Sequence, residues 1–289
     1  MRSLSVVIPC LNAAETLAVQ LEALAGQSWD GDWEVIVADN GSSDGSQAIV
    51  EEYGGRIESL RLVDASDRRG QARARNVGAA AARGEVLLFC DADDQVAPGW
   101  LAAMAKALDE HSFVACRYDN EALNPEWVQK THLNPQKDGL TRYDYPPFLP
   151  HAGGGGLGVR RAVHEEVGGF DESLPALEDT DYCWRIQLAG HPLAFVPDAV
   201  VNIRHRHELG SIYRQGVSYG LHNVLIYSRY RRRGMPRLGI LPGLLRWGKL
   251  LLKAPVMLLS REGRSRLAWQ LGWRIGRLAG CWRFRALAP

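Results

Sequence analysis

Short apolar runs alternate with amphipathic stretches along the first 110 residues. Runs rich in β-branched and other bulky apolar side chains predict buried strands, at residues 4–9, 34–38, 56–63 and 85–90. Helical spacing of apolar positions, together with capping and Pro signals, predicts helices at residues 15–24, 71–82 and 98–109. Strands that alternate with helices in this way predict an α/β fold with a mostly parallel central sheet flanked by helices.

Polar clusters follow three of these strands, at residues 9–12, 39–44 and 91–94. The carboxyl ends of parallel strands meet at one edge of a sheet, and ligands of open α/β sheets bind outside that edge. We therefore expect the three clusters to form one binding site.

The pattern weakens beyond residue 118. Residues 118–150 lose periodicity and gain Pro and Asn, which predicts a long surface loop and a candidate lid. The run Gly153–Gly156 indicates a backbone that passes close to another group, with a flexible loop as the alternative. A helix through Leu188 and strand segments between residues 195 and 203 follow.

Charge is distributed unevenly, although 46% hydrophobic and 23% charged residues is an ordinary globular composition. Residues 1–228 contain 19 Lys and Arg against 32 Asp and Glu, a net charge of −13. Residues 229–289 contain 15 Lys and Arg against one acid, Glu262, a net charge of +14. The sequence thus predicts an α/β domain over 1–228 and a basic helical tail over 229–289. The acidic body argues against a nucleic-acid-binding protein, and the tail is typical of segments that meet an anionic partner.

Cysteine usage and hydropathy point to a cytoplasmic protein. The cysteines are odd in number and scattered, without a zinc-like cluster, at Cys10, Cys90, Cys116, Cys183 and Cys281. We expect reduced thiols. The N-terminus lacks the long apolar stretch of a signal peptide, and no run of about 18 apolar residues predicts a transmembrane helix.

Carboxylates at two strand ends suggest chemistry there. Asp91-Ala92-Asp93 directly follows a predicted strand, where alternate carboxylates can bind Mg²⁺ or Mn²⁺ beside a diphosphate. Asp39 ends another strand and can accept hydrogen bonds from a nucleobase N–H or a ribose hydroxyl. Taken singly, each is also compatible with an acidic turn, and Asp94 is interpreted as a cap for the turn that follows.

Six motifs occur in a specific order and spacing. They are VVIPCLN (6–12), VADNGSSDGS (37–46), ARARNVG (72–78), LLFCDADD (87–94), GGFDE (168–172) and LEDTDYCWR (177–185). Together they resemble the family 2 glycosyltransferases of the GT-A fold, over about residues 3–207. The resemblance implies a Rossmann-like GT-A domain, a nucleotide-sugar donor and an Mn²⁺ or Mg²⁺ cofactor.

The resemblance also assigns donor-site and metal-site residues. Pro9 and Asn12 would shape the first nucleotide-binding loop, and Asp39 would recognise the base. The D-x-D motif would be Asp91, Ala92 and Asp93, with Asp93 the more direct metal ligand.

For catalysis, the resemblance implies that Asp179 is the general base of an inverting displacement. Glu178 would orient Asp179 or bind the acceptor. The base removes the proton of the acceptor hydroxyl as it attacks, and the metal neutralises the departing diphosphate. The simpler interpretation of Glu178-Asp179 is a helix N-terminus that favours acids, and both can hold.

Two further features have two interpretations each. Arg73 or Arg75 would bind the donor diphosphate, or else lie on a solvated helix face. His205 would complete the metal shell or touch the diphosphate, or else be a surface histidine like His207. Asn76 is expected to tie its helix to the first loop, and the glycine run Gly153–Gly156 to let the backbone approach the sugar or acceptor.

The processive members of the family carry a Q-x-x-R-W motif, whereas residues 215–219 here read QGVSY. We therefore expect single-sugar transfer of a hexosyltransferase type, in cell-envelope, glycolipid or polysaccharide synthesis, with a UDP-sugar preferred as donor. The alternatives are a sugar nucleotidyltransferase-like enzyme and a non-catalytic nucleotide-sugar-binding relative.

The tail has helical spacing of apolar residues, at Leu267, Leu271, Ile275, Leu278 and Trp282. Apolar stretches studded with Arg and Trp suit the surface of a membrane. The sequence therefore predicts peripheral contact with the inner face of the plasma membrane, and a lipid-linked acceptor. The alternative is a helical hairpin packed on the body or on a second subunit.

Overall fold

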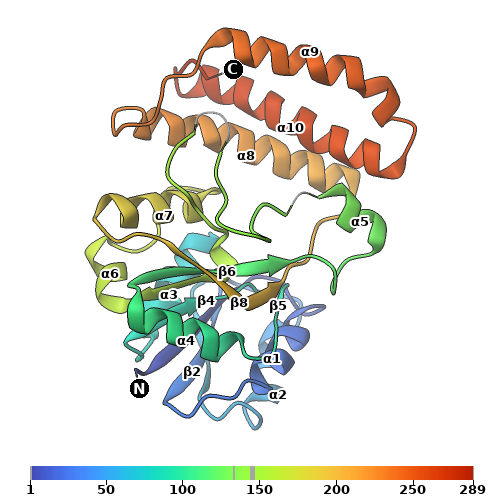
Figure 1. Ribbon diagram of the computed structural model, residues 1–289. Coiled ribbons are helices and arrows are strands. Elements are labelled where there is room, and N and C mark those ends of the chain that lie inside the picture. Colours follow the sequence, from blue (N-terminus) through green and yellow to red (C-terminus); the bar gives the residue numbers. More distant parts are fainter. Residues whose placement is uncertain (1, 133, 144–146, 289) are drawn as a thin grey trace. The chain divides into compact units, whose positions relative to one another are not determined.

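The computed structural model describes residues 2–132, 134–143 and 147–288 (Figure 1). Contacts between α-carbons divide the chain into two compact units. Unit 1 comprises Met1–Leu123, Asn134–Thr141 and Pro150–Arg204, and unit 2 comprises Asn124–Leu133, Arg142–Leu149 and His205–Pro289. The domain boundary predicted at residues 228/229 falls inside a helix of unit 2 and stays a prediction.

Unit 1 begins with the predicted alternation of strands and helices. The strands are β1 (Leu4–Cys10), β2 (Trp33–Asp39), β3 (Leu60–Asp64) and β4 (Val86–Phe89). The helices between them are α1 (Leu17–Ala25), α2 (Ser46–Tyr53) and α3 (Gln71–Ala81). The four strands pair in parallel in the order β3-β2-β1-β4, so their carboxyl ends lie at one edge, with Cys10 opposite Asp39. The predicted parallel sheet is confirmed for this half.

The other half of the sheet contains strands of both directions. Its strands are β5 (Gln95–Val96), β6 (Phe113–Asp119), β7 (Leu157–Arg160) and β8 (Ala194–Asn202), and the full order is β3-β2-β1-β4-β7-β6-β8-β5. Its helices are α4 (Trp100–Glu110), α6 (Arg161–Glu166) and α7 (Glu178–Leu188), with a 3₁₀ turn η1 at Gly154–Gly156. β7 runs antiparallel to both β4 and β6. β6 has no counterpart among the predicted elements.

Helices cover both faces of the sheet. One face packs against α1, α2 and α4 in the main apolar core, through side chains such as Ile8, Leu21, Val37 and Trp100. On the opposite face, Phe89 meets Phe170 edge to face at 5.2 Å, and Phe113 meets Tyr182 of α7 at 6.0 Å. The sheet is thus the middle of three layers, and its carboxyl edge stays available for a site.

Unit 2 consists of α5 (Glu126–Thr131), α8 (Leu209–Tyr230), α9 (Ile240–Met257) and α10 (Arg261–Arg283) in the described residues. The predicted loop over 118–150 therefore contains the helix α5, and part of it, residues 133 and 144–146, lies outside the described residues. In the described part of the chain, no helix is both long enough and apolar enough to cross a membrane.

Glycines set the packing of α8 on α10. A Cβ added at Gly220 would overlap the carbonyl oxygen of Trp273, and one added at Gly276 would overlap that of Val217. The buried face of α10 is accordingly a line of mostly small residues, Ser265, Gly272, Gly276, Arg277 and Gly280. The predicted apolar face is not this packing face: Ile275, Leu278 and Trp282 are 36%, 48% and 87% exposed.

We predict that Gly220→Ala lowers the free energy of unfolding by about 1–3 kcal/mol, because the added methyl group forces the backbones of α8 and α10 apart. Gly248→Ala in α9 is the matched control. An added Cβ meets nothing within 4 Å there, so the change should be neutral or stabilise by about 0.5–1 kcal/mol. Urea unfolding followed by circular dichroism measures both. Equal stability of the two variants would contradict the packing.

Candidate active site

The predicted donor loops meet at the carboxyl edge of β1 and β2. Pro9 pairs in register with Ala38, one position before the ends of the two strands. Asn12 has a φ of 50°, and its side-chain oxygen accepts a hydrogen bond from the backbone N–H of Ser43 at 2.9 Å. The Asn12 N–H donates in turn to the Ser42 hydroxyl at 2.9 Å. These bonds tie the loop after β1 to the loop after β2.

Asp39 is almost fully buried at the end of β2. Its two carboxylate oxygens accept hydrogen bonds from the Ser42 N–H at 3.1 Å and from the Gln47 side-chain amide at 2.6 Å. The carboxylate is therefore held in one orientation by its own loop and by α2. Pro9, Asn12 and Asp39 come together as the sequence predicts.

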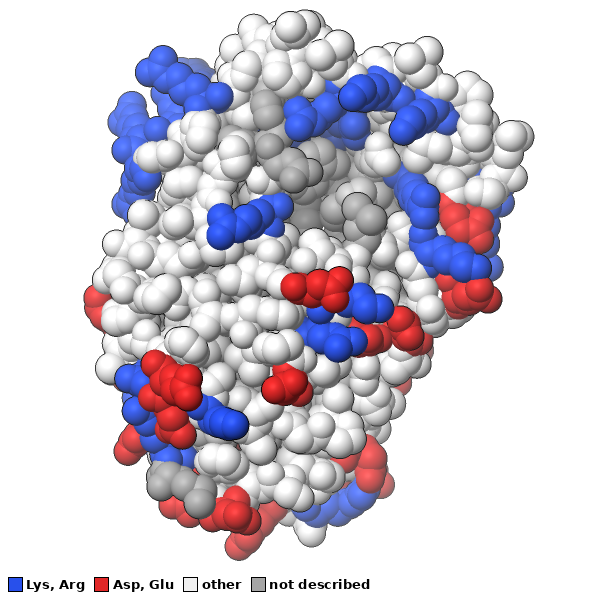
Figure 2. Space-filling model, viewed as in Figure 1, with Lys and Arg blue, Asp and Glu red and all other residues white. Residues whose placement is uncertain are grey.

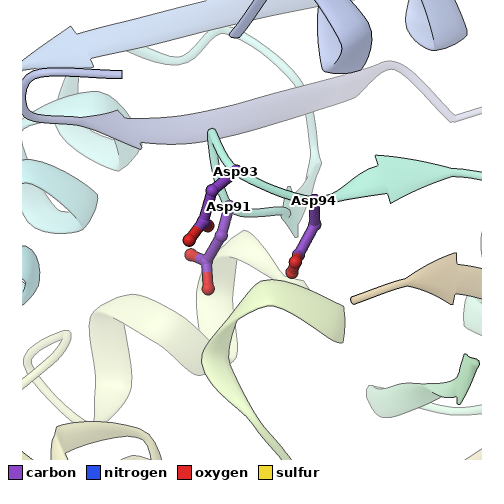
Figure 3. A group of neighbouring side chains, drawn as sticks. All are labelled: Asp91, Asp93 and Asp94. Carbon is purple, nitrogen blue, oxygen red and sulfur yellow. The ribbon is translucent and has the colours of Figure 1, made fainter. Parts of the chain in front are cut away.

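Three carboxylates gather on the loop after β4. Ligand oxygens of Asp91, Asp93 and Asp94 all lie within 4.8 Å of one another, and Figure 3 shows the side chains pointing to the same side of the loop. Asp94, expected only to cap a turn, belongs to this cluster. Burial, and then the negative charges of Asp91 and Asp93, raise the pKa of Asp94 well above its usual range. A divalent cation would relieve that repulsion, so the cluster fits a hard metal ion.

Two side chains hold this loop from outside the motif. The buried Gln20 of α1 donates to the Asp91 carbonyl at 3.1 Å and accepts from the Val96 N–H at 2.9 Å. The Arg204 N–H donates to the Asp94 carboxylate at 2.9 Å, and its guanidinium donates to the Asp93 carbonyl at 3.1 Å. Ala92, between Asp91 and Asp93 in this loop, is buried. The sequence contains a clue to the role of Gln20, because this polar residue lies on the same helix face as Leu17 and Leu21.

Arg75 lies buried between the acidic loop and α7. Its guanidinium donates to Asp91 Oδ1 at 2.8 Å and to Glu178 Oε1 at 2.8 Å. Burial alone disfavours its charge, but the carboxylates of Asp91, Glu178 and Asp179 outweigh burial and raise the pKa of Arg75. Arg75 is thus a fixed cation shared by two predicted parts of the site. Arg73, the other candidate, pairs with Asp67 at 2.8 Å and 3.0 Å instead.

The turn at residues 168–172 places the Phe170 ring beside the Arg75 guanidinium. The Asn76 side chain accepts from the Phe170 N–H at 2.8 Å and donates to the Phe170 carbonyl and to Glu172, each at 2.9 Å. The expected tie of Asn76 to the first loop is therefore wrong. The Phe170 ring lies 5.4 Å from the Arg75 guanidinium carbon, close enough for a cation–π contact.

The glycine run passes against the same guanidinium. A Cβ added at Gly154 would lie 2.6 Å from the Arg75 guanidinium, and one at Gly155 would lie 2.7 Å from Asp91 Oδ2. The Gly154 N–H donates to Asp179 Oδ2 at 3.1 Å. The predicted close approach is confirmed, and here its partners are side chains of the site. An approach to sugar or acceptor stays a prediction.

Glu178 and Asp179 open α7 after Leu177, whose φ is 62°. Burial, and then the charge of Asp179, raise the pKa of Glu178 to about 7, against the opposing effect of Arg75. Burial also raises the pKa of Asp179, again opposed by Arg75. Asp179 accepts a 2.6 Å bond from the Thr180 N–H in addition to the bond from Gly154. Strongly perturbed pKa values cluster at functional sites, which makes the Glu178-Asp179 pair a candidate for the chemistry.

His205, the third predicted metal ligand, belongs to unit 2. Its ring stacks on that of His132 with the ring centroids 4.3 Å apart. Its backbone N–H donates to the Asn124 side-chain oxygen at 2.8 Å. Burial, and then the proximity of His132, lower the pKa of His205 to about 4. The ring is therefore neutral near pH 7, as a metal ligand must be. Its part in a metal shell stays a prediction.

The sequence relatives identify the family. The family model described as "Glycosyl transferase family 2" matches residues 5–168, and the chain belongs to this family. Glycosyltransferase AglE of Haloferax volcanii is 27% identical over 203 residues, which is 68% of this chain and 65% of the relative. The pre-mycofactocin glycosyltransferase of Mycobacterium tuberculosis is 30% identical over 228 residues, 76% of this chain and 46% of the relative. The chain thus spans between about half and two thirds of the length of these relatives.

Solved structures agree on the fold. The mannosyltransferase PcManGT of Pyrobaculum calidifontis, in complex with GDP-Man and Mn²⁺, has a TM-score of 0.68 at 20% identity, covering 98% of this chain and 88% of that one. TarS 1–349 of S. aureus in complex with UDP has a TM-score of 0.53 at 19% identity, covering 98% and 92%. The fold is that of the GT-A glycosyltransferases, with a helical C-terminal region, as the sequence predicts.

We predict that Glu178→Gln changes the pH dependence of stability. The folded protein raises the pKa of Glu178 from 4.5 to about 7, so between these values the folded state holds the proton more tightly than the unfolded state. The stability that this proton contributes is present at low pH and is lost as the pH rises toward 7. The variant lacks this loss, so its stability relative to the wild type should rise from about pH 4.5 to 7 and then level off. A pH-independent difference in urea unfolding would refute the shifted pKa.

Proposed function

We propose that the protein transfers a single sugar from a nucleotide-diphosphate sugar to an acceptor hydroxyl, with inversion at the anomeric carbon. The observation that carries this proposal is the Arg75 bridge. This bridge joins two parts of the site: the acidic loop, which could bind a metal ion and a diphosphate, and the Glu178-Asp179 pair, which could supply a general base. Membership of family 2 favours glycosyl transfer over nucleotidyl transfer.

Asp91 and Asp93, with Asp94 beside them, would hold Mn²⁺ or Mg²⁺. Their oxygen-only donor set and the raised pKa of Asp94 support a divalent cation. When bound, the metal would offset negative charge on the departing diphosphate. The Mn²⁺ complex of the related mannosyltransferase fold supports the same choice.

The donor nucleotide would lie along the loops after β1 and β2. Asp39, fixed by Ser42 and Gln47, would accept a hydrogen bond from a base N–H, and Pro9 and Asn12 would shape the wall beside it. A uracil N–H suits Asp39, so a UDP-sugar is the preferred donor. The structural relatives include complexes with UDP and with GDP-Man, so a thermal-shift panel of UDP-, GDP-, dTDP- and CDP-sugars tests this choice.

Asp179 would act as the general base. The acceptor oxygen attacks the anomeric carbon, its proton passes to the Asp179 carboxylate, and the bond to the diphosphate oxygen breaks. The raised pKa of Asp179 suits this proton transfer. Glu178, held by Arg75, would orient Asp179 or the acceptor. The Arg75 guanidinium already donates to Asp91 and Glu178, so it would bind the donor in addition to these two carboxylates.

The acceptor would be lipid-linked, and the basic tail would contact the inner face of the plasma membrane in cell-envelope synthesis. In unit 2, Arg229, Arg231, Arg232 and Arg285 line a depression of about 350 Å³ that suits a phosphate group. The net charge of +14 over residues 229–289 supports an anionic surface as partner.

Asp93→Ala should abolish nearly all sugar transfer and most of the Mn²⁺-dependent thermal shift by the donor, because the variant removes a carboxylate of the metal cluster. Asp30→Ala removes an exposed carboxylate elsewhere and should change neither readout. Donor hydrolysis and transfer are measured with Mn²⁺ and with chelator. Equal activity of the wild type with and without chelator would exclude the metal role.

Asp179→Asn should keep the donor-induced thermal shift but lower turnover by about 10²–10⁴, the usual contribution of a positioned base. Asn preserves the size of the side chain and removes its proton affinity. Glu178→Gln is the matched control, expected to lose less because Glu178 is engaged by Arg75. Loss of donor binding in Asp179→Asn, with turnover of the bound donor unchanged, would place Asp179 in the donor site instead.

A further inference from the structure

α9 packs on α10 along one narrow stripe. Gly243 and Leu250 are buried, and Trp247, Ala254 and Met257 are partly buried. Spacings of three and four residues place all five on one side of the helix. Among the described residues of unit 2, only this side of α9 is covered.

A broad apolar sector of α9 stays exposed. Six large aliphatic side chains are between 57% and 82% exposed, namely Leu241, Leu244, Leu245, Leu251, Leu252 and Val256. At about 100° per residue they span the side of the helix that faces away from the packed stripe. A contiguous exposed surface of this kind indicates an interaction site rather than scattered apolar residues.

Basic residues border this sector on one side. Arg246, Lys249 and Lys253 are spaced by three and four residues, so they form a single exposed stripe between the apolar sector and the packed stripe. No Asp or Glu occurs between Glu208 and Glu262. Figure 2 shows Lys and Arg side chains over the region of α8, α9 and α10.

We propose that α9 is the membrane-docking element, lying flat on an anionic lipid bilayer with its apolar sector at the acyl boundary and its basic stripe among the headgroups. This inference rests on the proposed membrane contact of the tail and assigns it to α9, not to the predicted apolar face of α10. The basic stripe supports lipid over a second copy of the chain, because anionic headgroups neutralise it, whereas an antiparallel pair of α9 helices would bring their like charges together.

The test is co-sedimentation of the full-length protein with phosphatidylglycerol-containing vesicles and with neutral phosphatidylcholine vesicles. Leu245→Gln/Leu252→Gln should lower the partition coefficient onto anionic vesicles more than about tenfold, because both side chains leave the apolar phase. Lys249→Glu/Lys253→Glu should lower it by a similar factor at low salt and by less at high salt. Leu188→Gln and Lys106→Glu make matched changes on exposed positions of unit 1 and should bind like the wild type.

Each contrary result has a distinct meaning. A wild type that binds neither vesicle would refute the membrane contact itself, while donor thermal shifts report independently on the proposed enzyme. Binding that survives Leu245→Gln/Leu252→Gln but is lost in Ile275→Gln/Leu278→Gln would overturn the assignment to α9 and leave the membrane contact intact. A wild-type dimer that the α9 leucine variant converts to a monomer, with no vesicle binding, would assign the sector to a second copy.

Discussion

The ion pairs of Arg75 are the constraint on which the arrangement of unit 1 depends. One buried guanidinium holds Asp91 of the loop after β4 and Glu178 at the start of α7, each at 2.8 Å. Removing one member would leave buried charges uncompensated, which is far more costly than losing an exposed ion pair. The acidic loop and the Glu178-Asp179 pair therefore keep their mutual geometry without a ligand.

This constraint explains features that otherwise look unrelated. The backbone at Gly154 and Gly155 passes so close to Arg75 and Asp91 that no side chain fits. Phe170 supplies the ring beside the guanidinium and is positioned by Asn76, one residue along α3 from Arg75. Gln20 fixes the far side of the acidic loop. Motifs that are separate in the sequence thus contact one another around a single cation.

The site residues that follow a local sequence pattern could be predicted from the sequence. Strand ends marked by polar clusters located Asp39, Asp91 and Asp93, and ordered motifs located Asp179 and the family. The partners of Arg75 could not be predicted, because they lie 16 and 103 positions away and only the folded sheet brings them together. α8 was missed because its buried face includes Gly216, Gly220 and Asn223, which give no apolar periodicity.

The separation of 103 positions between Arg75 and Glu178 has a consequence for how the protein folds. Closing so long a loop costs chain entropy, which must be offset by contacts that form at the same time. The local βα pairs of the first 81 residues can form before that closure, whereas the carboxylates of α7 meet the guanidinium only when the reversed strand β7 has joined the sheet. We therefore expect the Arg75–Glu178 contact to form late in folding, and a chain interrupted before α7 would have the loops after β1 and β2 but not the Glu178-Asp179 pair.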